Sequence, residues 1–279
     1  MVEVQNLGKT YRTGKNIVRA LDGVSFSAGP GRIIGILGAN GAGKTTLFKL
    51  ICGIIQADCG RVSLFGSENI KAQAHRFGFL PENPEFGRNL NAYDILNFAL
   101  KVSGQAANRK EISAALEQAG LAGQEQRPLR HFSKGMRQRL GLAQAMIHKP
   151  ELLILDEPMS GLDPLGRAIM TDLVRSWTEG GGTVLLSTHD LDDIDLLCNE
   201  VMVITAGRLT LRDSLAALRK RSTFQVEWLD GRGRTSRSQS SAEQLWSDLA
   251  AGQNAGLELV RVKSDLHATL APFYQHEKP

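Results

Sequence analysis

The sequence has 279 residues, of which 42% are hydrophobic and 22% are charged, and its formal net charge is +4. These values are typical of a folded globular protein, and the length allows one large domain with a smaller appendage. No apolar run reaches the roughly 18 residues that a membrane span needs. The first residues lack the pattern of a secretory signal, and the three cysteines follow neither a disulfide nor a zinc spacing. We therefore expect a cytoplasmic protein, and its small positive charge is weak evidence for nucleic-acid binding.

The first 66 residues are rich in short strand patterns. Branched and aromatic residues separated by Gly, Asp and Pro predict strands at 2–5, 18–21, 24–27 and 62–65. A compact apolar strand is predicted at 33–37, and it ends in a glycine-rich turn. Helical character then begins at about Lys44 and stops near Gly53.

The following part of the chain changes from helical to alternating patterns. Residues 91–148 are predicted to be mainly helical, and Asn108 with Glu111 forms a capping-box pattern at the start of a helix that ends at Gly120. An apolar strand at 152–155, a helix from Asp163 to about residue 180 and a strand at 183–187 come next. Buried strands separated by helices predict a parallel sheet with crossover connections.

A phosphate-binding loop is predicted where the strand at 33–37 meets the next helix. The segment is Gly38-Ala39-Asn40-Gly41-Ala42-Gly43-Lys44-Thr45-Thr46, which fits the P-loop pattern in the strand–helix context that this pattern requires. Its glycines let backbone N–H groups face inward, and the helix N-terminus adds positive potential. Lys44 is predicted to reach the β- and γ-phosphates, and the Thr45 hydroxyl to ligate Mg²⁺. A chance glycine-rich turn is the alternative.

Two acids follow the apolar strand at 152–155. Ligands of parallel sheets collect at the carboxyl ends of the strands, where the P-loop also lies. Asp156 is predicted to hold Mg²⁺, and Glu157 to polarise the attacking water. His189 follows the strand at 183–187, and it could contact the γ-phosphate or the water if that strand neighbours the other two. Taken alone, such acids would start a solvated loop and such a histidine would be structural.

One further segment narrows the choice among P-loop ATPases. It is His131-Phe132-Ser133-Lys134-Gly135-Met136-Arg137-Gln138-Arg139-Leu140, and it resembles the signature motif of ABC ATPases in the Ser-Lys-Gly-Met form found in many exporter subunits. Ser133 and Gly135 resemble a helix N-terminus that offers a hydroxyl and N–H groups to phosphate. An ordinary capped helix would explain Ser133 but not the whole ordered set.

The resemblance covers roughly residues 1–215 and implies several further roles. Tyr11 matches the aromatic residue that stacks on adenine, and His189 matches the switch histidine. The segment Ser160-Gly161-Leu162-Asp163 resembles the loop that crosses to an opposite subunit. Two copies are then expected to sandwich two ATP molecules head to tail. The P-loop of one copy would face Ser133, Lys134, Gly135 and Asp163 of the other.

Three positions depart from the usual family pattern. Glu82, in Phe79-Leu80-Pro81-Glu82, stands where the family usually has Gln, and it is a candidate Mg²⁺ ligand beside Thr45 and Asp156. Lys134 replaces the usual Gly and adds a cation near the partner's nucleotide, and Met136 replaces the usual Gln. The same substitutions recur in the exporter branch of the family, so the sequence resembles drug- and antibiotic-export and copper-enzyme-maturation ATPases.

The resemblance also implies a fold and a division of the chain. We expect an α/β P-loop ABC-ATPase fold with a mixed, largely parallel core sheet, an antiparallel β subdomain and a helical subdomain at about 83–148. This nucleotide-binding domain would span residues 1–215, and residues 216–279 would form a small C-terminal α/β accessory domain. In the family, the region at 83–104 provides a groove for a short helix of the membrane subunit. Most of its apolar residues, individually, are expected to be helix core.

The leading hypothesis is therefore an ATP-binding and ATP-hydrolysing subunit that uses ATP and Mg²⁺, pairs with a second copy and drives a separate integral-membrane permease, with a preference for export. It would lie at the inner face of the cell membrane.

The alternative is a soluble ABC-type ATPase that acts on nucleic acid or ribosomes. One feature favours that alternative, a basic set made of Arg219, Lys220, Arg221, Arg232, Arg234 and Arg237. Because a run of charged residues is usually a solvated surface, no nucleic acid is expected. Glu157 and His189 argue against a regulator without turnover. The sequence does not identify the cargo.

Overall fold

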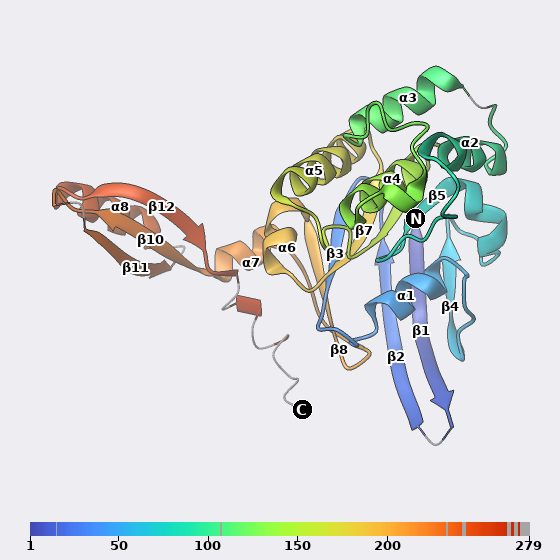
Figure 1. Cartoon of the computed structure of the whole chain (residues 1–279). Helices are drawn as coiled ribbons and strands as arrows, with labels where there is room; N and C mark the ends of the chain where they lie inside the picture. Colours follow the sequence, from blue (N-terminus) through green and yellow to red (C-terminus); the bar gives the residue numbers. More distant parts are fainter. Residues whose placement is uncertain are drawn as a thin grey trace.

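The core of the protein is a six-stranded mixed sheet (Figure 1). The computed structural model describes the chain except for residues 15, 107, 233, 242, 243, 267, 268, 271, 272 and 274–279. The strand order is β5-β6-β7-β3-β8-β9, in which only β9 runs antiparallel to its neighbour. The strands are β3 (Ile33–Leu37), β5 (Phe77–Leu80), β6 (Leu152–Asp156), β7 (Thr183–Thr188), β8 (Glu200–Thr205) and β9 (Arg208–Ser214).

The central strands are apolar along their whole length because both faces of the sheet are covered. Every residue of β3, β6 and β7 is buried. Alternate residues point to opposite faces: Leu153 and Leu155 enter one core cluster, whereas Leu152 and Ile154 enter the other. The predicted parallel sheet is confirmed, and its hydrophobic strands follow from this double burial.

A second, antiparallel sheet has the order β2-β1-β4 and packs on one of these cores. Its strands are β1 (Val2–Thr13), β2 (Asn16–Ala28) and β4 (Cys59–Leu64). The prediction of separate strands at 18–21 and 24–27 is wrong, because both belong to the continuous strand β2. The register passes from Leu7↔Val24 to Lys9↔Leu21, which places an extra residue at Asp22–Gly23. Gly23 has φ 71°, so the residues that suggested a turn instead form a β-bulge.

The helices fall into two groups. The first group borders the central sheet: α1 (Lys44–Ile51), α5 (Pro164–Glu179) and α6 (Leu191–Leu197). The second group consists of α2 (Ala92–Val102), α3 (Arg109–Gln118) and α4 (Lys134–Met146). These three helices form a helical region with its own core, which includes Leu96, Leu116 and Leu140. Short 3-10 helices cover Ile70–Arg76 and Leu129–His131. Within the described part of the chain, no helix combines the length and the apolar composition that crossing a lipid bilayer requires.

The start of α3 differs from the sequence prediction. Asn108 caps the helix, but its side chain accepts from the N–H of Lys110 rather than that of Glu111. Glu111 forms an ion pair with Lys149 at 2.9 Å. The predicted capping box at this helix is therefore wrong, because a tertiary ion pair takes its carboxylate. A capping box does form at α2, between Asn91 and Asp94.

A three-stranded antiparallel sheet with one helix lies away from the central sheet, beyond α7 (Leu215–Arg221) (Figure 1). Its elements are β10 (Thr223–Leu229), β11 (Thr235–Ser241), α8 (Leu245–Asn254) and β12 (Glu258–Ser264). The chain then returns, because Leu266 and Leu270 pack into the core cluster on the central sheet. Thr205 donates a hydrogen bond to the carbonyl of Phe273 at 2.7 Å. The appendage is thus attached at both of its ends.

The close packing of α6 on β3 gives a test of the fold. A methyl group added at Gly35 would lie 2.2 Å from Ile194 Cδ1 and 2.7 Å from Cys198 Sγ. We predict that Gly35→Ala lowers the free energy of unfolding by about 1–3 kcal/mol, the usual effect of overpacking. Chemical denaturation measures this change. Gly29→Ala is the matched control, since nothing lies within 4 Å of that position; an equal loss in both variants would contradict this packing.

Candidate functional site

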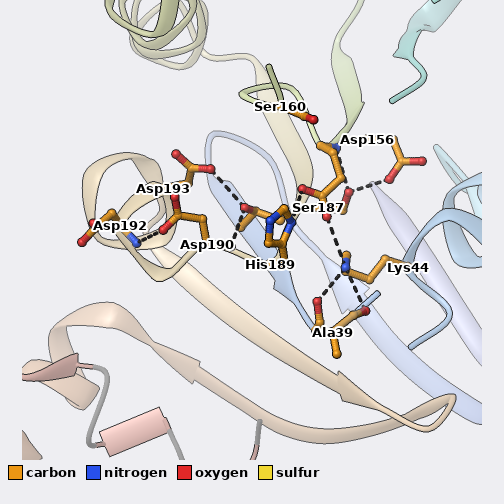
Figure 2. A network of polar contacts seen from close by, with 12 residues as sticks. Ala39, Lys44, Asp156, Ser160, Ser187, His189, Asp190, Asp192 and Asp193 are labelled. Atoms are coloured by element: carbon orange, nitrogen blue, oxygen red, sulfur yellow. Dashed lines mark hydrogen bonds and ion pairs between the residues drawn. The ribbon is translucent and has the colours of Figure 1, made fainter. Parts of the chain in front are cut away.

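Three neighbouring strands bring the predicted functional groups to one edge of the central sheet. β7 lies between β6 and β3, and all three run parallel. In the register, Leu37 pairs with Thr188 and Asp156 pairs with Ser187. The loops that follow these strands therefore begin side by side at the carboxyl edge, where parallel sheets bind ligands (Figure 2).

The P-loop connects β3 to α1 and curls around the Lys44 side chain. Gly43 has φ 109°, and a Cβ there would lie 2.3 Å from the carbonyl oxygen of Ala20, so only glycine fits. No side chain caps the N-terminus of α1, whose N–H groups can therefore bind an anion. The buried Lys44 ammonium donates to the carbonyls of Gly38 at 2.6 Å and Ala39 at 3.1 Å (Figure 2).

Asp156, the last residue of β6, is a buried carboxylate. It accepts a hydrogen bond from the Ser187 hydroxyl at 2.6 Å and another from the Thr45 side chain. Burial raises the pKa of the Asp156 carboxyl above its usual range, and the hydrogen bonds from Ser187 and Thr45 oppose this effect only in part. The site therefore holds a poorly solvated carboxylate that a cation would stabilise.

Glu157 connects the P-loop lysine to the histidine after β7. Its Oε1 lies 3.2 Å from Lys44 Nζ, and its Oε2 lies 2.9 Å from His189 Nδ1. Its backbone has φ 50°, in the left-handed region that non-glycine residues rarely adopt. The N–H of Glu157 donates to the Ser187 hydroxyl at 2.9 Å and fixes this turn. Strained backbone of this kind is typical of functional sites.

Other predicted site residues lie farther along the surface. Tyr11 is partly exposed on β1, opposite Val18 of β2, and the ring lies 5.9 Å from Lys9 Nζ. The same strand β2 reaches the P-loop through Ala20. Glu82 is exposed just after β5. Among the described residues, neither Tyr11 nor Glu82 forms a hydrogen bond or ion pair with the P-loop or with Asp156.

The signature segment contacts the Ser160–Asp163 loop of its own chain. Ser133 caps α4 by accepting from the N–H of Met136, and Asp163 caps α5 in the same way from Gly166. Lys134 Nζ donates to the Ser160 hydroxyl at 3.4 Å. Within the described residues, no hydrogen bond or ion pair links Ser133, Lys134 or Gly135 to residues 38–46.

Sequence reasoning missed two sets of polar residues beside this site. Ser187 bridges Asp156 and the backbone of Glu157. Thr188 donates to the buried Asp193, which also binds Arg167 of α5. Ser187 and Thr188 were visible as hydroxyl residues at the end of an otherwise apolar strand. Nothing local marked Arg167 or Asp193, because they meet only through the packing of α5 on α6.

The donors present fit a magnesium ion that takes further ligands from phosphate and water. Within the described residues, no three His, Cys, Asp or Glu side chains form a metal cage. Thr45 and Asp156 supply adjacent oxygens. The hydrogen-bond donors to the desolvated Asp156 carboxylate are the neutral hydroxyls of Ser187 and Thr45, so a cation could still neutralise its charge. Mg²⁺ is commonly bound by one or two protein oxygens together with substrate phosphates.

Similarity to known proteins identifies the family of this chain. A family model described as "ABC transporter" matches residues 21–160, which include the P-loop, the signature segment and Asp156–Glu157. The chain therefore belongs to the ABC transporter family, and it is an ATP-binding protein of that family of ATPases. The predicted family and the predicted fold are confirmed.

Several known proteins are similar to this chain over most of its length. The chain is 40% identical over 224 residues to an ABC transporter ATP-binding protein of Synechocystis, covering 77% of this chain and 63% of that relative. It is 34% identical to the lantibiotic transport ATP-binding protein SrtF of Streptococcus pyogenes, over 76% of this chain and 90% of the relative. A solved ATP-binding cassette, dimeric and bound to ADP and phosphate, shares the fold with a TM-score of 0.72 and 23% identity, over 77% and 99% of the two chains.

The raised pKa of Asp156 gives a test of the site. Because folding disfavours the charged carboxylate, Asp156 costs stability above its raised pKa, and this cost disappears in acid where it is protonated. We predict that Asp156→Asn stabilises the chain without nucleotide by on the order of 1 kcal/mol at pH 8, with a smaller gain at pH 5. Urea denaturation at both pH values measures the difference. A loss of stability at pH 8 would contradict the assigned cause.

Proposed function

We propose that this protein hydrolyses ATP held by residues 38–46, with Glu157 as the general base. One observation carries the proposal: Lys44, Glu157 and His189 are joined by direct contacts at the ends of three adjacent strands. Tyr11 is proposed to stack on the adenine, as its match to the family motif implies.

Lys44, Glu157 and His189 have different roles in the proposed hydrolysis. The β- and γ-phosphates together carry more negative charge than the Glu157 carboxylate, so bound ATP draws the Lys44 ammonium away from Glu157. Glu157 then accepts a proton from a water molecule. The water oxygen forms a bond to the γ-phosphorus, the bond to the β-phosphate oxygen breaks with its electron pair, and ADP and phosphate result. His189 holds Glu157 Oε2 and orients the water.

Magnesium is the proposed cofactor, with Thr45 and Asp156 as its ligands and Glu82 as a candidate third. When bound, the ion supplies positive charge that balances the β- and γ-phosphates. The exposed position of Glu82 after β5 leaves its carboxylate able to turn toward the carboxyl edge. Its negative charge there favours a cation more strongly than the usual Gln would.

A second copy of the chain is proposed to complete the site. Within the described residues, Ser133, Lys134 and Gly135 form no hydrogen bond or ion pair with their own P-loop, yet Ser133 and Gly135 form a helix N-terminus suited to phosphate. Lys134 adds a cation, and Asp163 starts the neighbouring helix α5. A head-to-tail dimer would bring these four residues to the partner's ATP. A solved cassette with the same fold is dimeric, which supports the pairing of two copies.

A groove beside the helical region is the proposed contact for a membrane-spanning permease. It has a volume of about 220 Å³, and its lining includes Phe77, Phe79, Phe98 and Val102. Phe98 and Val102 are 64% and 70% exposed, and lying one helical turn apart they form a contiguous apolar surface that a partner could cover. By contrast, the neighbouring residues Ile95, Leu96 and Leu100 are core, in line with the expectation that most of this segment packs internally.

Through such a permease, the protein would act at the inner face of the cell membrane. Its Lys134–Met136 signature and its similarity to a lantibiotic transport ATP-binding protein favour export. Residues 1–215 are proposed as the nucleotide-binding domain, with the helical subdomain at 83–148, and residues 216–279 as the accessory domain. The last part of that segment, residues 274–279, lies outside the described residues.

The nucleic-acid alternative loses its main support in the structure. It depended on the basic set at 219–221, 232, 234 and 237. Four members of this set pair with carboxylates: Arg219 with Asp195 at 2.7 Å, Arg221 with Asp213 at 3.0 Å, Arg234 with Asp230 at 2.8 Å, and Arg237 with Glu227 at 3.2 Å. Guanidinium groups balanced in this way offer little net charge to a phosphate backbone.

The role of Glu157 can be tested by removing only its charge. We predict that Glu157→Gln lowers kcat at least ~100-fold, the usual contribution of a general base, and that this variant accumulates as an ATP-bound dimer. Phosphate release and size-exclusion chromatography with ATP and Mg²⁺ measure the two effects. Glu179→Gln, at an exposed position of α5, is the control and should match the wild type. Equal hydrolysis by Glu157→Gln would exclude Glu157 as the base.

The permease groove gives a separate prediction. Phe98→Ala should reduce co-purification with a membrane subunit encoded beside the gene at least ~10-fold, as expected for a buried aromatic anchor. ATP binding by the isolated chain should be unchanged. Ile17→Ala, also exposed but on β2, serves as the control. If Ile17→Ala disrupts the complex and Phe98→Ala does not, the groove is not the contact.

A further inference from the structure

Asp193 is a buried carboxylate that the proposed hydrolysis does not use. It lies in the first turn of α6, and its side chain is only 5% exposed. Burial raises the pKa of Asp193, and the nearby Arg167 guanidinium opposes that shift. A charged group is seldom kept in such a position without specific partners, and here those partners surround His189.

Asp193 and Asp190 lie close to His189 (Figure 2), and the partners of Asp193 form a short network on both sides of the histidine. The Thr188 hydroxyl donates to Asp193 Oδ2 at 3.0 Å and accepts from the N–H of Asp190 at 2.9 Å. Arg167 Nη2 donates to Asp193 Oδ1 and lies 3.5 Å from Asp190 Oδ2. Thr188 and Asp190, the residues immediately before and after His189, are therefore both bound to the half-buried ion pair of Arg167 and Asp193.

Arg167 links this network to the proposed dimer contact. It lies in the first turn of α5, and its N–H donates to the carbonyl of Asp163 at 2.9 Å. Asp163 caps that helix and ends the Ser160–Asp163 loop, which the proposed dimer places against the partner's ATP. The first turn of α5 is thus in contact with this loop at one end and, through Arg167, with the segment that carries His189 at the other.

We propose that Arg167 is a positioning residue for ATP hydrolysis, which fixes His189 against Glu157 through Asp193 and Asp190. This inference rests on the ATPase function proposed above. Because α5 begins at the loop that faces the second copy, the same contact lets dimer closure set the position of His189. Arg167 touches neither ATP nor the attacking water in this account, and it acts only through the histidine.

A second arginine of α5 provides a matched control. Arg175 also joins α5 to α6, through a 2.7 Å hydrogen bond from its Nη2 to the carbonyl of Leu196. Leu196 lies at the far end of α6 from Asp193 and His189. Arg167→Met and Arg175→Met therefore remove equivalent side-chain groups that connect the same two helices, and only the first removes a contact with the histidine segment.

The test is a double-mutant cycle in the full-length chain, which separates residues that act together from residues that act independently. Steady-state and single-turnover ATP hydrolysis are measured for Arg167→Met, for His189→Ala and for the double variant, with thermal unfolding as a check on folding. We expect Arg167→Met to lower kcat about tenfold, within the range for coupled residues, with KM for ATP changed less than about twofold. In the His189→Ala background the same substitution should have almost no effect. Arg175→Met should hydrolyse ATP like the wild type, and Arg167→Lys should regain most of the lost rate.

Specific results would overturn the inference. Equal losses from Arg167→Met with and without His189, or an equal loss in Arg175→Met, would reduce Arg167 to a general role in packing. If Arg167→Met does not fold, Asp193→Asn takes its place in the cycle and must show the same dependence on His189. A wild-type chain that cannot bind ATP would instead overturn the proposed function itself.

Discussion

The parallel pairing of β7 with β3 on one side and with β6 on the other sets the position of every group in the site. The register places Leu37 beside Thr188 and Asp156 beside Ser187, so three loops of very different sequence leave the sheet at the same level. A shift of β7 by one residue would turn Ser187 away from Asp156 and exchange the side chains that face the two cores. Val184 and Leu186 pack in one core and Leu185 packs in the other, so such a shift would disrupt the close packing of both cores.

This pairing also explains how charged side chains are held in a poorly solvated place. Asp156 is stabilised by hydroxyl groups of Ser187 and Thr45, whereas Glu157 lies between Lys44 and His189. In a region of low dielectric, each such contact is stronger than it would be in water, and losing one partner is correspondingly costly. The positive φ of Glu157 aims its carboxylate at Lys44 and His189. The site is thus preorganised by the fold, which favours electrostatic stabilisation of charge that develops on a phosphate.

The sequence was sufficient for the features that depend on local chemistry, namely the glycine-rich turn between β3 and α1, the apolar strands of the central sheet and the family itself. It failed where tertiary contacts decide the outcome. Asp22–Gly23 resembled a turn, but pairing with β1 made it a bulge within one long strand. Glu111 fitted a capping box, but Lys149 attracts its carboxylate. Arg167 and Asp193 lie 26 residues apart in the chain and belong to no local pattern, so only the packing of α5 on α6 could reveal them.

The central claim is that one ATP is bound by residues 38–46 of one copy and by Ser133, Lys134 and Gly135 of another, with Glu157 facing the γ-phosphate. A crystal structure of Glu157→Gln with ATP and Mg²⁺ tests this claim most directly. The account predicts two chains arranged head to tail, with Lys44 Nζ on the β- and γ-phosphate oxygens and the side chain at position 157 within hydrogen-bond distance of an in-line water. ATP bound with no contact from the signature segment of a second chain, or with position 157 turned away from the γ-phosphate, would contradict it.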